Sequence, residues 1–461
     1  MSIASPRSPY DPRHDPLTDA GPGMNRDYAP TYWIATAGEP PADDGPVTAD
    51  VDADVVIIGS GYTGLSCAIH LARDHGLKAV VVEANTVAWG CSTRNGGQAQ
   101  ISTGRLKRSE WIARWGLETA KGLHAEVLAG FELFRSLLKE DEIDCDPQDG
   151  GHLYIAHRER LLRTIEVESR LLNDVFHYPT KVLSAGQLRV EQVDDREAFG
   201  AVYEPDGVGV HAAKLAFGYL KLARRLGATV YTGSPVLGWT TRNGVHHVAT
   251  PGGTVRARAV AIATAGYTPP SMDRLTRHRL FPVLSNSVVT RPLTAAERAS
   301  CGFRSKAFYT DTRTLRHYYR CLPDGRVQIG SRSAITGADA ENPLHLGRLR
   351  AALARKFPAL EAIKLDYSWW GWVDVSHDLM PRIFQPDSAR TIYYALAYGG
   401  NGVMYSAQAG RRLAQLVAGK GVGLKLPIFQ SQLPTEGLLT PFRRLGQRLL
   451  YRRYYAQDEA R

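Results

Sequence analysis

Residues 53–98 read ADVVIIGSGYTGLSCAIHLARDHGLKAVVVEANTVAWGCSTRNGGQ and are the most regularly patterned part of the chain. The apolar run Val55–Ile58 predicts a buried parallel strand. Apolar residues then recur at helical spacing until Gly76, which ends the predicted helix. A second apolar run, Ala79–Val82, ends in an acidic residue, Glu83. Strand, helix and strand in this order predict a βαβ unit.

The turn between the first strand and the helix has the spacing G-x-G-x-x-G, formed by Gly59, Gly61 and Gly64. The first glycine permits a tight turn, the second lets the backbone approach a pyrophosphate, and the third lets helix and strand pack closely. Free amide groups at the helix start, around Tyr62 and Thr63, would meet phosphate charge. The pattern therefore favours a dinucleotide site over an ordinary βαβ turn.

The acidic end of the second strand points to the type of nucleotide. Glu83 can accept hydrogen bonds from a ribose hydroxyl and would repel a 2′-phosphate, so NADP is disfavoured. Ala84 follows directly and belongs to the same predicted cofactor contact.

Residues 87–98 distinguish FAD from NAD. Small residues and glycines suit a backbone that lies against a cofactor, although a surface loop is the plainer interpretation. The segment resembles the G-x-G-A-S-x-R-N-G-G segment of the D-amino-acid oxidase/glycine oxidase superfamily of flavoenzymes. That resemblance implies that the segment passes beside the ribityl chain and isoalloxazine of FAD. The implied cofactor residues are Ser92, Thr93, Arg94, Asn95, Gly96, Gly97 and Gln98.

Composition narrows the classes of partner. The net charge of +10 is compatible with nucleic acid, membrane or anionic ligands. Basic residues are scattered, however, and cluster only near the C-terminus, and no zinc-finger or RNA-binding motif is present. We therefore expect no nucleic-acid partner.

The cysteines and the N-terminal residues indicate the cellular compartment of the protein. Five cysteines lie far apart with no CxxC pair, which favours a reducing compartment and predicts neither a disulfide framework nor a metal site. Residues 1–50 contain no apolar segment typical of a secretory signal, and no apolar run approaches the ~20 residues that span a bilayer. We expect a cytoplasmic protein.

The predicted fold is of the mixed α/β class: a Rossmann-type FAD-binding domain with an inserted antiparallel-sheet substrate domain. Residues 51–145, 205–275 and 376–440 form the first, and residues 146–204 and 276–375 the second. Within the inserted domain the segments Val283–Arg291, Thr314–Arg320, Arg326–Ser331 and Leu365–Val373 are strand-like. Residues 203–210 read as a turn-rich connector, residues 1–50 as a partly disordered arm, and residues 441–461 as a basic tail.

Two further segments supply cofactor candidates. A strand at residues 391–396 leads into a glycine-rich turn and a helix, which in the superfamily abuts the flavin pyrimidine. Its implied contacts are Gly400, Asn401, Gly402 and Val403, where Asn401 replaces the usual His and cannot become cationic. Val236, Ala265 and Gly266 occupy the positions that the superfamily places near adenine and pyrophosphate.

Three segments resemble the γ-glutamylputrescine oxidase group of bacterial FAD-dependent amine oxidases. They are the N-terminal arm with Tyr28 and Tyr32-Trp33, the segment around Trp372, and the tail, in which a Pro-Phe pair, basic residues and a Tyr-Tyr pair follow one another. Departures from the group, Cys91 and Thr93, lie where the flavin would sit. The resemblance implies noncovalent FAD and oxidation of a C–N bond by hydride transfer from a neutral amine, with hydrolysis of the imine. The amine would be a polyamine or a γ-glutamyl-polyamine.

Aromatic residues of the inserted sheet are the catalytic candidates: His317, Tyr318, Trp369 and Trp370. Because side chains alternate along a strand, either Tyr318 or His317 faces the flavin, and the sequence leaves both open. Arg320 or Arg332 could pair with a substrate carboxylate.

Several alternatives stay open. The electron acceptor is oxygen or a quinone. A D-amino-acid or glycine-type dehydrogenase or oxidase is the second functional hypothesis. A flavin-bearing protein that binds RNA or membrane through its basic tail is the third, although a tail helix packed on its own domain is the plainer interpretation.

Overall fold

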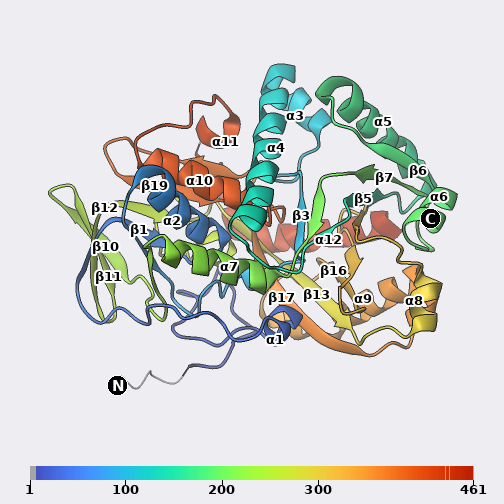
Figure 1. The fold of residues 1–461 in the computed structure, drawn as a ribbon, viewed down its shortest axis with the longest axis horizontal. Coiled ribbons are helices and arrows are strands. Elements are labelled where there is room, and N and C mark those ends of the chain that lie inside the picture. Colours follow the sequence, from blue (N-terminus) through green and yellow to red (C-terminus); the bar gives the residue numbers. More distant parts are fainter. Residues whose placement is uncertain (1–6, 431, 436, 460–461) are drawn as a thin grey trace.

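The computed structural model describes residues 7–430, 432–435 and 437–459. Its first sheet runs β10-β11-β12-β1-β2-β9, with β19 beside β12 and β18 beside β19 (Figure 1). The strands are β1 (Val51–Ile58), β2 (Ala79–Val82), β9 (Thr229–Tyr231), β10 (Gly238–Arg242), β11 (Val245–Thr250), β12 (Gly253–Ile262), β18 (Arg382–Phe384) and β19 (Ile392–Leu396). The central strand β1 pairs in parallel with both β2 and β12, and the apolar half of β1 is buried, as its composition predicts.

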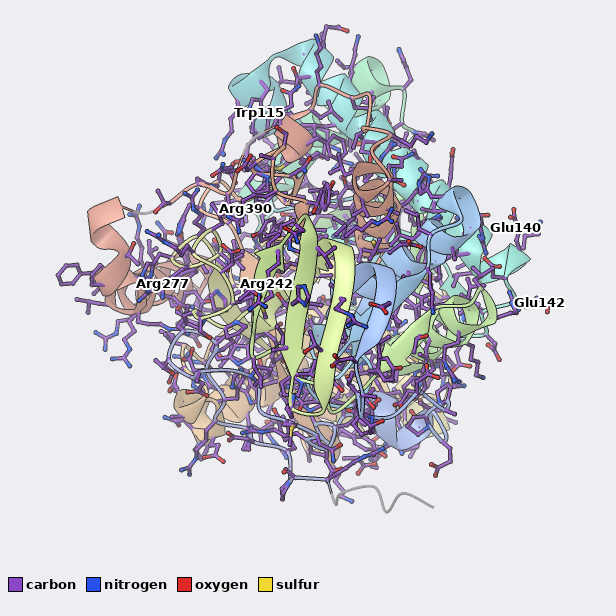
Figure 2. The ribbon with its side chains drawn as sticks, turned by 90° about the vertical axis from the view of Figure 1, so that its left-hand side faces the viewer. Trp115, Glu140, Glu142, Arg242, Arg277 and Arg390 are labelled. Carbon is purple, nitrogen blue, oxygen red and sulfur yellow. The ribbon has the colours of Figure 1, made fainter. Side chains whose placement is uncertain are left out.

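Helices cover one face of this sheet. Alternate residues of β1 point to opposite faces and therefore belong to two different cores. Val55 and Ile57 belong to the core under the helices, whereas Val56 and Ile58 belong to the core on the other face. The helices of the first core are α2 (Tyr62–His75), α4 (Leu117–Glu140), α7 (Ala212–Arg225) and α10 (Tyr405–Val417). At the outer edge of the sheet, Arg242 stands exposed at the end of β10 (Figure 2).

A second sheet has the order β17-β13-β16-β15-β14-β5-β7-β6 and is antiparallel except between β14 and β5. Its strands are β5 (His152–Ile155), β6 (Lys181–Ser184), β7 (Gly200–Glu204), β13 (Phe281–Thr290), β14 (Phe308–Asp311), β15 (Tyr318–Cys321), β16 (Val327–Ser331) and β17 (Leu365–Val375). Both inserted stretches of the chain thus build one sheet. Strand β15 is shorter than the strand-like segment that begins at Thr314, and β14 had no sequence signal.

The predicted connector at residues 203–210 is instead the end of β7 followed by a strand, β8 (Gly207–Gly209). Strand β8 lies between β3 (Gln98–Gln100) and β4 (Gln148–Asp149) in a three-stranded sheet. A side chain at Gly207 would meet the carbonyl carbon of Gly151 at 2.6 Å. The segment is therefore glycine-rich because two backbones approach closely there, a requirement that sequence reasoning mistook for a turn.

The remaining helices lie around these sheets. They are α1 (Tyr32–Thr36), α3 (Arg108–Trp115), α5 (Glu159–Phe176), α6 (Ala185–Glu191), α8 (Ala295–Cys301), α9 (Pro343–Lys356), α11 (Pro427–Gln430) and α12 (Arg443–Glu459), with 3-10 turns η1 (Cys91–Thr93), η2 (Ala265–Tyr267), η3 (Ala338–Glu341), η4 (Pro358–Leu360) and η5 (Gly437–Phe442). Among the residues the structure describes, no helix has the length and apolar character needed to cross a bilayer.

The terminal segments that the structure describes pack on the folded body. In the N-terminal arm the Asn25 amide donates to the Ala84 carbonyl, and Trp33 is buried. Helix α12 is fixed near its start, where Arg444 Nη2 lies 2.7 Å from Asp15 Oδ1. Its outward side leaves Leu445 exposed.

Candidate functional site

One large cavity lies where the two main sheets meet, with about 1270 Å³ of empty space including the part open to solvent. Its lining comes from the start of α2, the segment around η1, the turn before α10, and strands β13, β15 and β17 of the second sheet. No single stretch of chain forms this space, because each wall comes from a different part of the sequence.

Thirteen of the predicted cofactor residues line the cavity. They are Gly61, Tyr62, Thr63, Ser92, Arg94, Asn95, Gly96, Gln98, Ala265, Gly400, Asn401, Gly402 and Val403. The lining does not include Gly59, Gly64, Glu83, Ala84, Thr93, Gly97, Val236 and Gly266. Four of this second group, Gly59, Gly64, Glu83 and Gly97, have structural roles in the turn and the loop that form this wall.

The three fingerprint glycines have distinct geometries. Gly59 has a φ of +104°, a conformation that side chains disfavour, and a Cβ there would meet the Ala263 carbonyl oxygen at 2.8 Å. A Cβ at Gly64 would lie 1.9 Å from the Gly59 carbonyl oxygen. At Gly61 a Cβ would meet only the Ser92 hydroxyl, at 3.0 Å, and this residue lines the cavity. Two glycines thus shape the turn, and Gly61 leaves its backbone open to a bound group.

Glu83 already serves as an acceptor within the turn. Its Oε2 accepts hydrogen bonds from the amide and hydroxyl of Ser60, and its Oε1 accepts one from the amide of Asn85. Burial raises the pKa of the Glu83 carboxyl. A carboxylate has about four lone-pair sites, so a ribose hydroxyl could still bind beside these donors.

The chain passes close to Ala84 and Val236 without leaving them in the cavity. The Ala84 carbonyl accepts a hydrogen bond from the amide of Asn25, so the N-terminal arm covers this position. Val236 packs against the core on the face of the first sheet that lacks the major helices. The predicted cofactor contacts of Ala84 and Val236 stay predictions.

The segment after β2 is held by its own polar side chains. Asn95 donates to the carbonyls of Cys91 and Ser92 and accepts from the amide of Gly97. Gly97 has a φ of +63°, and a Cβ there would meet the Val210 carbonyl oxygen at 2.1 Å. This loop presents its backbone to the cavity in one fixed shape.

Arg94 lies in an aromatic cage. Its guanidinium is 4.2 Å from the centre of the Trp89 ring and donates to Tyr267 Oη at 3.0 Å. Its Nε and Nη2 are buried without a hydrogen-bond partner. The rings of Tyr10, Trp89 and Tyr267 surround this guanidinium.

The side-chain amide of Asn401 holds the turn before α10 through hydrogen bonds. Asn401 donates to Ser102 Oγ at 3.2 Å and to the Gly104 carbonyl, and it accepts from Gln100 Nε2 at 3.0 Å. The nearby Asp374 carboxylate accepts from the amide of Ala397, and burial raises the pKa of Asp374 to about 6. The replacement of His by Asn thus leaves the turn itself uncharged.

Register decides which aromatic candidate meets the cavity. Tyr318 lies opposite Gly330 in the pairing of β15 with β16, and its ring occupies the space that a Gly330 side chain would need. Its hydroxyl lies 3.0 Å from the hydroxyls of both Ser285 and Ser287. Tyr318 therefore lines the cavity, and His317 does not.

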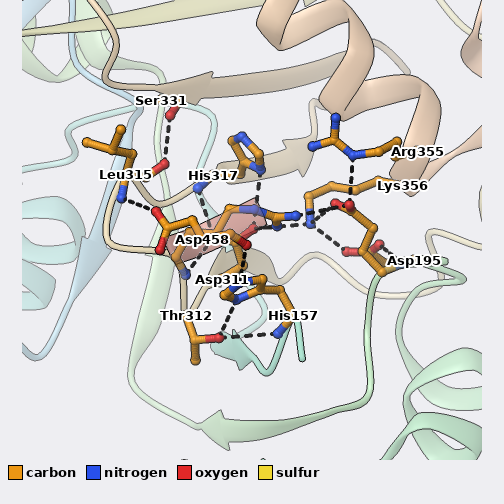
Figure 3. Close-up of polar contacts among 12 residues, drawn as sticks. His157, Asp195, Asp311, Thr312, Leu315, His317, Ser331, Arg355, Lys356 and Asp458 are labelled. Carbon is orange, nitrogen blue, oxygen red and sulfur yellow. Dashed lines mark hydrogen bonds and ion pairs between the residues drawn. The ribbon is translucent and has the colours of Figure 1, made fainter. Parts of the chain in front are cut away.

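The other three aromatic candidates lie elsewhere. His317 Nδ1 is 3.3 Å from Asp311 Oδ2, inside a buried group of charges on the opposite side of the strand (Figure 3). Trp369 donates to the Arg94 carbonyl behind the cavity wall, and Trp370 packs edge-on against His345. None of the three is among the lining residues. Alternation along β17 separates Trp370 from the lining residue Gly371, whereas Trp369 shares the side of Gly371 and lies against the loop at Arg94.

Sequence reasoning missed most of the charged lining. Arg105, Arg316 and Arg332 all face the cavity, and only Arg332 had been considered. Arg320, its alternative, is buried elsewhere and donates to the Val210 carbonyl at 2.6 Å. No local signal marks Arg105 or Arg316, since an arginine in a loop is ordinarily solvated.

Two of the five cysteines, Cys91 and Cys321, differ in their position relative to the cavity. Cys91 lines the cavity, whereas Cys321 ends β15 outside it. Burial raises the pKa of the Cys91 thiol to about 12, which keeps it protonated at neutral pH.

Comparison with known proteins gives concordant results. The family described as DAO, FAD dependent oxidoreductase, matches residues 54–416. The chain is 30% identical over 404 residues to the gamma-glutamylputrescine oxidoreductase of Escherichia coli, covering 85% of this chain and 90% of that protein. It is 24% identical to the glycine oxidase of Bacillus licheniformis, covering 80% and 94%. The crystal structure of glycine oxidase from Geobacillus kaustophilus superposes with a TM-score of 0.70 at 21% identity, covering 82% and 97%.

Proposed function

The chain belongs to the DAO family of FAD-dependent oxidoreductases, and on this premise we propose that it oxidises the C–N bond of a small amine. The observation that carries the proposal is the shared cavity, in which the fingerprint segments of the first sheet face Tyr318 of the second. A cofactor held by the first wall would present its reactive face to a substrate held by the second.

FAD fits the residues present. The amides at the start of α2, next to the open backbone of Gly61, suit the pyrophosphate. The rigid loop around Asn95 would lie along the ribityl chain and flavin ring, and the turn at Gly400 would meet the pyrimidine end. The Nε and Nη2 donors of Arg94, which have no hydrogen-bond partner in the chain, would offer a further contact to the cofactor. Bound noncovalently, FAD would supply hydride acceptance from the carbon next to the amine nitrogen.

The chain itself would bind and orient the amine. Burial of the amine against the ring of Tyr318 would lower the pKa of the amine and favour its neutral, reactive form. No strong base is then required. The relative from Escherichia coli makes a polyamine or a γ-glutamyl-polyamine one candidate substrate. Hydrolysis of the imine by water would yield a carbonyl product and an amine or ammonia.

A second candidate is the oxidation of D-amino acids or glycine, which Arg332 in the cavity wall favours because a guanidinium pairs with a carboxylate. The electron acceptor would be oxygen or a quinone, which peroxide release and quinone reduction assays distinguish.

Anaerobic bleaching of the flavin absorbance tests the proposal. The purified, FAD-bound protein is mixed with amines and amino acids in the absence of oxygen, and bleaching identifies the class that reduces it. A protein that carries no flavin, or a flavin that no amine or amino acid bleaches, would contradict the proposed function.

A further inference from the structure

Three arginines gather at one end of the cavity. Arg105 lies in the loop before α3, Arg316 in the loop between β14 and β15, and Arg332 directly after β16. Among the described residues, none of the three guanidinium groups forms an ion pair, because no carboxylate oxygen lies within 4.0 Å of their nitrogen atoms. The acidic lining residue Asp374 instead binds the amide of Ala397.

The three charges are close enough to oppose one another. The charge of Arg332 holds the pKa of Arg105 well below its ordinary value, with burial and the charge of Arg316 adding to the effect. Burial lowers the pKa of Arg332, and the Tyr451 hydroxyl of α12 partly offsets this. A buried group of like charges is unfavourable on its own and becomes favourable when an anion joins it.

The backbone turn before α10 positions two of the arginines. Arg332 Nη2 donates to the Gly399 carbonyl oxygen at 3.2 Å. The side chain of Arg105 lies against the same residue, since a Cβ at Gly399 would meet its Cγ at 3.0 Å. Most donors of both guanidinium groups remain free to bind a ligand.

Helix α12 fixes the third. The Asp458 carboxylate accepts hydrogen bonds from the amides of Thr314 and Leu315, both at 2.9 Å (Figure 3). The adjacent Glu459 lies 3.1 Å from Arg313 Nε. The C-terminal helix thereby holds the loop on both sides of Thr314, so that Arg316 reaches the cavity with its Nε buried and unpartnered.

We propose that Arg105, Arg316 and Arg332 form an anion site that binds the carboxylate groups of the amine substrate. The inference rests on the proposed function and narrows its substrate to acidic amines. A guanidinium binds a carboxylate through two parallel hydrogen bonds, and three of them accommodate more than one carboxylate. Free diamines and polyamines are cations, so the same cluster repels them.

The first test measures binding without turnover. The FAD-bound full chain is titrated with glutarate, which has two carboxylates and no amine, and the change in flavin absorbance gives a dissociation constant. Butyrate, with one carboxylate, is titrated in the same way. We expect glutarate to bind about tenfold more tightly or better, because its second carboxylate gains a charge-assisted contact.

Substitutions assign the binding to the cluster. Arg316→Gln and Arg332→Gln should each weaken glutarate binding about 10- to 100-fold. Arg316→Lys keeps the charge and should retain part of the affinity. Arg242→Gln, at the exposed end of β10, is the matched control and should change nothing (Figure 2). The FAD content of each variant reports that its fold is intact. Glutarate affinity equal to that of butyrate, or unchanged in both Gln variants, would overturn the anion site.

The second test separates the substrate class from the reaction. Putrescine, 4-aminobutyrate and the two enantiomers of glutamate share a four-carbon amine skeleton with zero, one and two carboxylates. We expect anaerobic bleaching to be fastest with a glutamate enantiomer, slower with 4-aminobutyrate and absent with putrescine. Putrescine that bleaches as fast as glutamate would overturn the acidic substrate and leave amine oxidation intact. Arginine-dependent glutarate binding without bleaching by any amine would leave the anion site and refute the proposed function.

Discussion

Replacing Lys356 by Met should destabilise the protein severely. The ammonium group of Lys356 is completely buried and lies 3.1 Å from Asp195, 3.3 Å from Asp311 and 3.6 Å from Glu197 (Figure 3). Burial alone would raise the pKa of the Asp311 carboxyl, yet Lys356 and its cationic neighbours hold it well below its ordinary value. Methionine matches the shape of lysine and removes the charge, so the carboxylates would be left buried without their shared partner.

The magnitude follows from these distances. At an effective dielectric constant of about 20, one contact near 3.3 Å corresponds to about 5 kcal/mol. Desolvation of the buried ions offsets much of the total, and loss of one partner from such a group costs about 3–5 kcal/mol. Lys364 offers a matched control, because its side chain is 78% exposed and lies 3.2 Å from Asp366. Lys364→Met should cost at most about 1 kcal/mol.

Urea unfolding of the FAD-bound proteins, followed by fluorescence at neutral and acidic pH, measures both effects. A carboxyl whose pKa is depressed on folding stabilises the protein above its unfolded pKa and loses that contribution as the pH falls. The difference between wild type and Lys356→Met should therefore shrink below about pH 4. A loss no larger than that of Lys364→Met, or a difference that does not change with pH, would refute the reasoning.

Three more outcomes are expected. Gly64→Ala should abolish FAD retention on gel filtration, because its Cβ would lie 1.9 Å from a backbone oxygen, whereas Gly347→Ala, with no atom within 4 Å, should keep FAD. Tyr318→Phe leaves two serine hydroxyls without their shared partner and should lower the unfolding free energy by about 1–3 kcal/mol in urea, with FAD content unchanged. Asp374 has a raised pKa of about 6, so it costs stability as the pH rises from about 4 to 6; Asp374→Asn should flatten that stretch of the pH–stability curve measured by thermal unfolding, and an unaltered curve would count against it.

Local chemistry explains why the first part of the site was predictable. The turn at Gly59 and Gly64 needs a positive φ in one case and the absence of a side chain in the other, and only glycine meets either demand. The continuous apolar run of β1 and the helical spacing of α2 are likewise readable over a few residues. Asn95 and Gly97 are joined by a hydrogen bond within their own loop, so this part of the site is also predictable from residues close in the chain.

Reasoning from local sequence failed where a glycine could be explained either by a turn or by a close approach of two backbones. At Gly207 it indicated a turn, but the residue lies in a strand that a second backbone approaches. A glycine in a sequence indicates that a side chain would not fit, but it does not indicate which neighbouring group occupies the space. The contact of the N-terminal arm with Ala84 likewise joins distant segments, and the polar composition of the arm does not indicate it.

The sequence by itself determined the βαβ unit, its glycine turn and the loop that follows, because each depends on interactions among residues close in the chain. Only the tertiary structure decided that Tyr318 rather than His317 meets the cavity, because this depends on the register of β15 against Gly330. It alone also brought Arg105, Arg316 and Arg332 together, since the loops that carry them are joined by sheet packing and by a C-terminal helix docked on buried charge. Convergence of distant segments is a property of packing, and no local pattern encodes it.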